Sequence, residues 1–188
     1  MKKLIFTITI IFFGSYINAQ TISLSQVPDQ TPNGSYLKDI DNTLPLFTGT
    51  WTANFEGKQV TLNISDVIVS HPIKILDTRY TSDVLFMRYT VKDSNGNQLA
   101  STMNKTTTNA NIISTFTSPD KNSIAFDYRG EECGIGEGFI ILKKIDSNHI
   151  KWEYNSTGGL IDPKQCSNYS DNIKSYIPRT LDLTFTKQ

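Results

Sequence analysis

The chain has 188 residues with 18 basic and 18 acidic side chains, so its formal net charge is zero. Such a balance provides no electrostatic field that would attract nucleic acid or an anionic membrane, and we expect neither as a partner. The length fits one domain with a hydrophobic core of its own.

The first twenty residues, MKKLIFTITIIFFGSYINAQ, have the pattern of a secretory signal peptide. Lys2 and Lys3 precede an apolar run that ends at Phe13, and this run is too short for a membrane-spanning helix. We predict a signal peptide over residues 1–19, whose removal leaves 16 basic against 18 acidic residues, a net charge of −2. The expected location is the periplasm or the exterior of a Gram-negative bacterium, and the mature chain is expected to have no membrane span.

Two regions follow the predicted signal peptide. Residues 20–43 are polar and rich in turn-forming residues, and we expect an extended N-terminal segment there. In residues 44–188 apolar and polar residues alternate repeatedly, which is the period of a β-strand with one buried face. The alternating stretches are GTWTANFE, KQVTLNIS, VLFMRYTVK, NSIAFDYR, NHIKWEY and TLDLTFTK. We predict an all-β domain, an antiparallel up-and-down meander of eight to ten strands.

The predicted connections differ in length. Asn95-Gly96 accepts the positive φ angles of a type I′ turn and is the strongest hairpin signal. If consecutive strands pair, short and long connections alternate along the chain. The tight turns would then gather at one end of the sheet and the long loops at the other. The short connections are 56–57, 93–96, 118–121 and 146–148, and the long ones are 66–83, 103–108, 130–137 and 155–178.

Cys133 and Cys166 each lie in one of these long loops, so both are expected over the same end of the sheet. An even number of cysteines in an exported protein predicts a disulfide bond. Such a bond requires the two Cα atoms to approach within about 7 Å. The alternative is a pair of free or buried thiols.

A sheet of this length must close into a barrel or fold into a sandwich, because otherwise one apolar face stays exposed. Gly49-Thr50-Trp51, in the first alternating stretch, resembles the Gly-x-Trp of the lipocalin and calycin superfamily. The resemblance implies a closed lipocalin-like barrel with Trp51 packed at one end, under a basic side chain from a late strand. Arg179, at the start of the last alternating stretch, is the candidate. The tight turn at 56–57 departs from the lipocalin pattern, in which the first connection is a large loop at the open mouth.

The chain also resembles small secreted lipocalin-like bacterial proteins of unknown function, and this resemblance implies a fold but no activity. Aromatic residues share the buried parity of the predicted strands. They either line a cavity for a small ligand or fill an ordinary core, and the sequence leaves both readings open. The candidate lining residues are Trp51, Phe55, Tyr89, Phe126, Tyr128, Trp152 and Tyr154.

No motif for catalysis, phosphate binding or metal binding is present in the sequence. His71 and His149 have no second ligand at metal spacing, so neither a metal nor a cofactor is expected. Glu131 and Glu132 are the one acid–base pair that the glycine-rich stretch RGEECGIGEGF offers, and a loop with solvated acids is the favoured interpretation. We expect a monomeric secreted binding module and not an enzyme. It would hold a small apolar or amphipathic ligand, or contact a partner with its long-loop rim. The alternative is a structural or interaction protein with a filled barrel.

Overall fold

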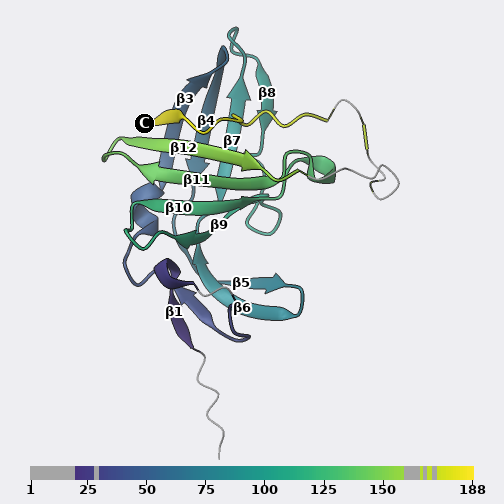
Figure 1. Cartoon of the computed structure of the whole chain (residues 1–188). Coiled ribbons are helices and arrows are strands. Elements are labelled where there is room, and N and C mark those ends of the chain that lie inside the picture. Colours follow the sequence, from purple (N-terminus) through teal and green to yellow (C-terminus); the bar gives the residue numbers. More distant parts are fainter. Residues whose placement is uncertain (1–19, 28–29, 159–165, 167–168, 171–172) are drawn as a thin grey trace, which may run out of the picture.

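The structure is a computed structural model that describes residues 20–27, 30–158, 166, 169–170 and 173–188. The predicted signal peptide, residues 1–19, lies outside the described residues. Within them the chain folds into thirteen strands and three short 3₁₀ helices (Figure 1). None of the described helices has the length and apolarity needed to cross a bilayer.

The elements follow one another along the chain without an α-helix among the described residues. The helices are η1 (Leu24–Gln26), η2 (Leu44–Phe47) and η3 (Glu132–Gly134). The strands are β1 (Thr21–Ser23), β2 (Tyr36–Lys38), β3 (Gly49–Phe55), β4 (Lys58–Ile64), β5 (Ile68–Ile75), β6 (Thr78–Val84), β7 (Met87–Lys92), β8 (Gln98–Ser101), β9 (Ile112–Thr117), β10 (Ser123–Tyr128), β11 (Gly138–Lys144), β12 (His149–Ser156) and β13 (Leu183–Lys187).

Nine strands form one antiparallel sheet in the order β8-β7-β4-β3-β13-β12-β11-β10-β9. Strands β9 to β13 pair in chain order, as the predicted meander requires, and β13 then pairs with β3, which places Lys187 opposite Trp51. The predicted alternation is present: in β12, Ile150, Trp152 and Tyr154 are buried and their neighbours are more exposed. The sheet curves strongly, so that β11 and β12 run across the view of Figure 1 while β3, β4 and β7 run along it.

The curved sheet is an open half-barrel, so the prediction of a closed lipocalin-like barrel was wrong. The two end strands, β8 and β9, do not pair with each other. The connection over 102–111 brings the chain back to the end at which β8 began, so β8 and β9 run in the same direction. Strand β9 instead meets the chain just before β7, through a bridge between Phe86 and Ile113 and a hydrogen bond of 2.9 Å from Ser114 N to Leu85 O.

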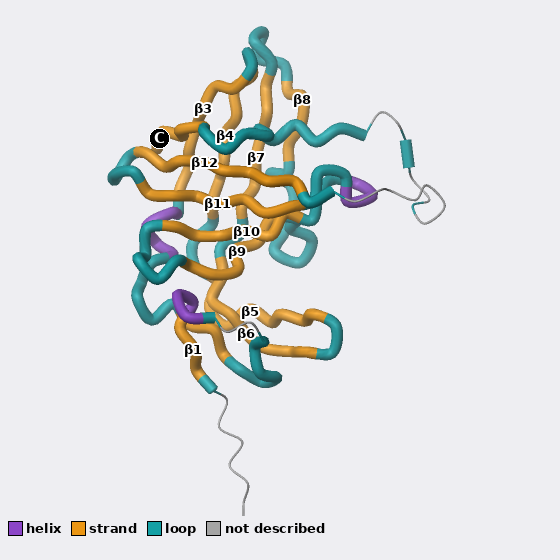
Figure 2. The backbone as a smooth tube through the Cα atoms, viewed as in Figure 1, coloured by secondary structure: helices purple, strands orange, loops and turns teal. Residues whose placement is uncertain are grey.

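A second, four-stranded sheet in the order β1-β2-β6-β5 lies beside β9 (Figure 2). Its hairpin, β5 and β6, occupies the region 66–83 that the sequence predicted as a long connection. Its other two strands come from residues 20–43, the expected extended segment, and they pair in parallel. The hairpin was missed because Pro72 and His71 interrupt its apolar pattern. Its turn, Leu76-Asp77, relies on a positive φ of 52° at a leucine, which no turn rule predicts.

The loop 130–137, the segment 173–182 and two of the tight turns lie at the same end of the large sheet, whereas the connection 66–83 leaves from the opposite end. The register sets Phe55 opposite Lys58 and Tyr128 opposite Gly138, and links these strands through β12 and β13. The tight turns and the long loops therefore do not separate completely, contrary to the prediction. The reason is that the 102–111 connection crosses from one end of the sheet to the other, so every later connection lies at the end opposite to the one predicted relative to the earlier turns. We call this end the loop rim, and it comprises the turns at 56–57 and 93–97, the loop 130–137 and the segment 173–182.

The concave side of the large sheet holds the main hydrophobic core. Trp51 and Trp152 are fully buried there, and each indole N–H is satisfied by a backbone carbonyl. Trp51 Nε1 donates to Phe47 O at 3.0 Å, and Trp152 Nε1 donates to Pro178 O at 2.9 Å. Because buried N–H groups without an acceptor destabilise a fold, these two bonds fix η2 and the 173–182 segment against the sheet.

Candidate functional site

Six of the seven aromatic residues predicted to line the barrel form a packed interior. The rings of Trp152 and Phe185 lie 5.7 Å apart, and those of Tyr128 and Tyr154 lie 5.9 Å apart. Such contacts between rings are those of a filled core. Trp51, Tyr89, Phe126, Tyr128, Trp152 and Tyr154 are all 3% exposed or less. Phe55 differs, because it is only half-buried and lines a pocket at the loop rim.

The cation over Trp51 is Lys187 and not Arg179, so this part of the lipocalin comparison needs correction. The Lys187 ammonium lies 5.0 Å from the centre of the indole ring. The strand register explains why Lys187 takes the position predicted for Arg179, because Lys187 of β13 is directly opposite Trp51 of β3. Strand β13 begins at Leu183, four residues after Arg179, and Leu181 is 62% exposed, so the predicted face does not extend back to Arg179.

Cys133 and Cys166 form the predicted disulfide bond, with Cα atoms 5.8 Å apart. The bond ties the glycine-rich loop 130–137 to the following long connection. Gly136, with φ of 78°, belongs to the same contact, because a Cβ there would lie 2.7 Å from Ser175 Cβ. The loop rim is therefore fastened by a covalent bond and by close packing.

Two buried tyrosines are hydrogen-bonded to the loop rim through Glu131. Tyr128 Oη donates to Glu131 Oε1 at 2.6 Å, and Tyr89 donates to the same oxygen. Tyr128 Oη and Ser175 Oγ are also in contact, at 3.3 Å. Burial raises the pKa of both phenols far above the usual range, and the Glu131 carboxylate raises it further. Glu131 Oε1 thus accepts two hydrogen bonds, while Glu132 is exposed.

The pocket at the loop rim has a volume of about 360 Å³, which is in the range of small-molecule sites. Its lining combines apolar and charged side chains. Lys58 contacts Glu56 at 3.9 Å. Lys174 and Arg179, in contrast, have no carboxylate within 4.0 Å among the described residues. The lining residues are Phe55, Glu56, Lys58, Val60, Lys174, Ser175, Tyr176, Ile177 and Arg179.

A model of the family of unknown function DUF6705 matches residues 1–188. The chain belongs to this family. No curated protein and no solved structure matches it. Membership of DUF6705 therefore assigns the chain to a family without naming a ligand or a reaction, and the lipocalin resemblance stays a prediction.

The histidines of this DUF6705 chain do not point to a metal site. His149 Nδ1 lies 2.9 Å from Asp146 Oδ2 at a turn, and the ring of His71 packs edge-on against Phe86 at 5.2 Å. Burial, with a smaller contribution from Arg129, lowers the pKa of His71. The described residues contain no group of three or more His, Cys, Asp or Glu side chains that could hold a metal ion.

Lys174 of the rim pocket was not predicted from the sequence, and Arg179 was predicted to contact Trp51 and not a pocket. A signal was present, because the stretch NIKSYIPR places these two cations on either side of Tyr176 and Ile177. This stretch follows the long connection and has no strand period, so nothing in it predicted that it would fold back over Phe55. Only the tertiary structure brings the two cations and the apolar residues together.

Proposed function

We propose that this protein is an exported binding module that holds a small amphipathic anion in the rim pocket. The apolar side chains of Phe55, Tyr176 and Ile177 would contact the hydrocarbon part of the ligand. Lys174 and Arg179 would contact its anionic group. The observation that carries the proposal is that these two cations have no carboxylate within 4.0 Å among the described residues and line a pocket together with apolar side chains.

Three features support this proposal. Lys174 and Arg179 are both exposed, and a bound carboxylate or phosphate would accept charge-assisted hydrogen bonds from them. The disulfide bond and the Gly136 contact order the rim before a ligand arrives, which reduces the entropy lost on binding. The signal-peptide pattern and the disulfide bond are both typical of an exported chain.

Isothermal titration with decanoate tests this function, and decanol serves as the uncharged probe of equal chain length. We expect decanoate to bind with one-to-one stoichiometry and decanol to bind at least about tenfold more weakly, because the charged group contributes hydrogen bonds to the cations. The variant Lys174→Gln/Arg179→Gln should lose this preference. The matched variant Lys105→Gln/Lys144→Gln removes two cations elsewhere and should keep it.

The filled interior favours a second candidate, an interaction protein that contacts a partner with its loop rim and takes no small ligand. The packed rings of Trp152, Tyr154 and Phe185 are the observation behind it. Incubation with a bacterial lipid extract, followed by mass spectrometry of the retained molecules, separates the two functions. A retained acid that the double variant at the rim no longer holds supports the small-ligand module. Retention of no small molecule by the unmodified protein, together with no decanoate binding, would support the interaction protein instead.

A further inference from the structure

The small sheet carries two cations that face each other. Lys74 of β5 and Arg79 of β6 are directly opposite in the strand register. Like charges at opposite positions of paired strands repel and weaken the pairing. In the described part of the chain neither side chain has a carboxylate within 4.0 Å, although Asp77 lies in the turn that joins the two strands.

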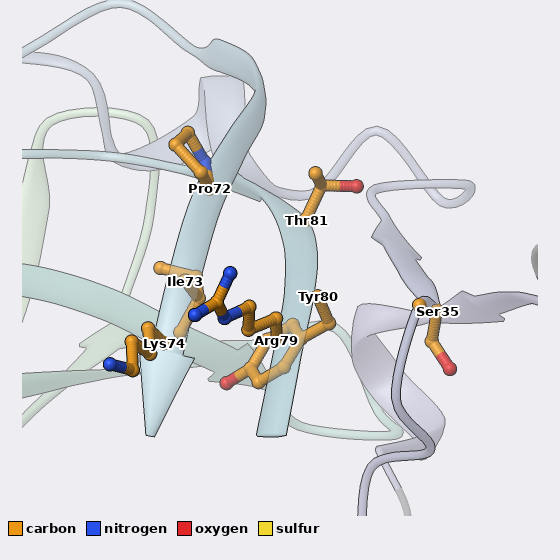
Figure 3. A pocket seen from close by; sticks show the side chains of 8 residues that line it. Ser35, Pro72, Ile73, Lys74, Arg79, Tyr80 and Thr81 are labelled. Carbon is orange, nitrogen blue, oxygen red and sulfur yellow. The ribbon is translucent and has the colours of Figure 1, made fainter. Parts of the chain in front are cut away.

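These two side chains lie on an open pocket of about 580 Å³ (Figure 3). Figure 3 shows the Arg79 side chain extending from β6 toward Ile73 and Lys74 of β5. The pocket is larger than a bare inorganic anion needs, and it lies within the size range of sites for small organic molecules. The other lining residues are Gly34, Ser35, Pro72, Tyr80 and Thr81.

The backbone of Arg79 is fixed on both sides by the segment that precedes β2. Arg79 N donates to Asn33 Oδ1 at 2.9 Å, and Gly34 N donates to Arg79 O at 2.7 Å. Thr81 N donates to Ser35 O at 3.0 Å, which extends the same contact along β6. The wall that carries the guanidinium is therefore ordered before any ligand binds, which reduces the entropic cost of binding.

The free edge of β5 is poorly suited to an added strand. Pro72 lies in the middle of this edge strand and has no N–H to donate. Ser70 N already donates to Asp83 Oδ1 at 3.1 Å. An extended peptide would find few free donors along this edge, so the exposed feature of the small sheet is the pocket and its cation pair.

We propose that this pocket binds the phosphate monoester of a small organic molecule. A guanidinium donates two parallel hydrogen bonds to phosphate oxygens and a lysine adds a compact positive charge, so Arg79 and Lys74 together suit one phosphate. A phosphate monoester carries about −1.5 to −2 charges near neutral pH, which matches two cations. The organic part would lie against Pro72 and Ile73. The site lies on the small sheet and does not depend on the rim pocket.

Titration of nitrogen-15-labelled protein with phenyl phosphate, benzoate and phenol tests the assignment by NMR. We expect phenyl phosphate to shift the amide signals of Lys74, Arg79 and Thr81 in a saturable way, benzoate to bind more weakly, and phenol to leave them unchanged. The variant Lys74→Gln/Arg79→Gln should weaken phenyl phosphate binding at least about tenfold. The variant Lys105→Gln/Lys144→Gln, with the same change in net charge, should bind as the unmodified protein does.

Thermal unfolding without ligand distinguishes a binding role from a structural one. If the repulsion between Lys74 and Arg79 destabilises the folded protein, the single variant Lys74→Gln raises the melting temperature or leaves it unchanged, while the affinity for phenyl phosphate falls. A lower melting temperature would mean that Lys74 stabilises the sheet, and it would overturn the proposal. Equal affinities for benzoate and phenyl phosphate would overturn the assignment to phosphate, and so would shifts that persist in the double variant. A final titration uses inorganic phosphate. If inorganic phosphate binds as tightly as phenyl phosphate, the organic part of the ligand makes no contact with the pocket, and a phosphate monoester site is refuted.

Discussion

Raising the pH above 10 should unfold this protein through Tyr89 and Tyr128. Both side chains are 1% exposed or less, and burial, together with the Glu131 carboxylate, raises both pKa values above the ordinary value of 10.0. In the unfolded chain each phenol releases its proton near pH 10, whereas the folded protein retains both protons. The stability that these groups contribute is therefore complete below pH 10 and is lost as the pH rises toward the folded pKa.

The size of the effect follows from the number of retained protons. One proton that the folded state keeps and the unfolded state has released lowers the free energy of unfolding by about 1.4 kcal/mol per pH unit. Two tyrosines lower it by about 2.7 kcal/mol per unit. A domain of ordinary stability, roughly 5–15 kcal/mol, thus loses a large share of its stability by about pH 12.

Urea unfolding followed by circular dichroism at a series of pH values measures this slope. The variant Tyr89→Phe/Tyr128→Phe removes both phenols, so its stability should fall about 2.7 kcal/mol less per pH unit above 10. Return to neutral pH should restore the folded signal, which controls for alkaline cleavage of the disulfide. The reasoning is refuted if the slope is the same in the double variant, or if tyrosinate absorbance from Tyr89 and Tyr128 appears near pH 10 while the protein stays folded.

Two further perturbations test the rim and the barrel end. The variant Cys133→Ser/Cys166→Ser opens a link between residues 33 apart and should lower the free energy of unfolding by about 3–4 kcal/mol, measured by urea unfolding; a difference within experimental error would mean that the bond does not form. In a double-mutant cycle, Trp51→Ala should cost about 3–5 kcal/mol and should be coupled to Lys187→Ala by roughly 0.5–2 kcal/mol. Coupling of Trp51 to Arg179→Ala in place of Lys187→Ala would contradict the pairing of β13 with β3.

The sequence predicted well those features that depend on local alternation. In β12 and β4 the period of two is uninterrupted, and both strands are found within a few residues of the predicted positions. The disulfide bond could be predicted because Cys133 and Cys166 each follow a recognisable strand, so counting reversals was sufficient. These inferences require only that neighbouring strands pair, which is the usual arrangement in antiparallel sheets.

The predictions were wrong where a segment pairs with a part of the chain that is distant in sequence, or where a strand begins several residues after its predicted start. Strand β13 begins at Leu183, later than predicted. The basic residue over Trp51 is therefore Lys187 at the end of this strand and not Arg179, which precedes it. Strands β1 and β2 pair in parallel with each other, and β2 pairs in parallel with β6, so their stability comes from tertiary contacts and leaves no period in the sequence. Closure of the barrel depends on where the 102–111 connection leads, which local patterns do not encode.

The position of β13 has a consequence for how the chain reaches its native state. Although it is the last strand in sequence, it lies at the centre of the large sheet, where Thr186 pairs with Thr52 across more than two thirds of the chain. Strand β13 is the link between β3 and β12 in the sheet, so the pairing of β3 and β12 through this strand is complete only after residue 187 has become available, although Phe86 and Ile113 also connect the two halves at the other side. Such distant pairing is associated with slow folding, in milliseconds to seconds. Until then one edge of β3 and one edge of β12 are unpaired and can pair with other chains. This interval is therefore the one in which the chain is most prone to aggregation and in which a chaperone would protect it most.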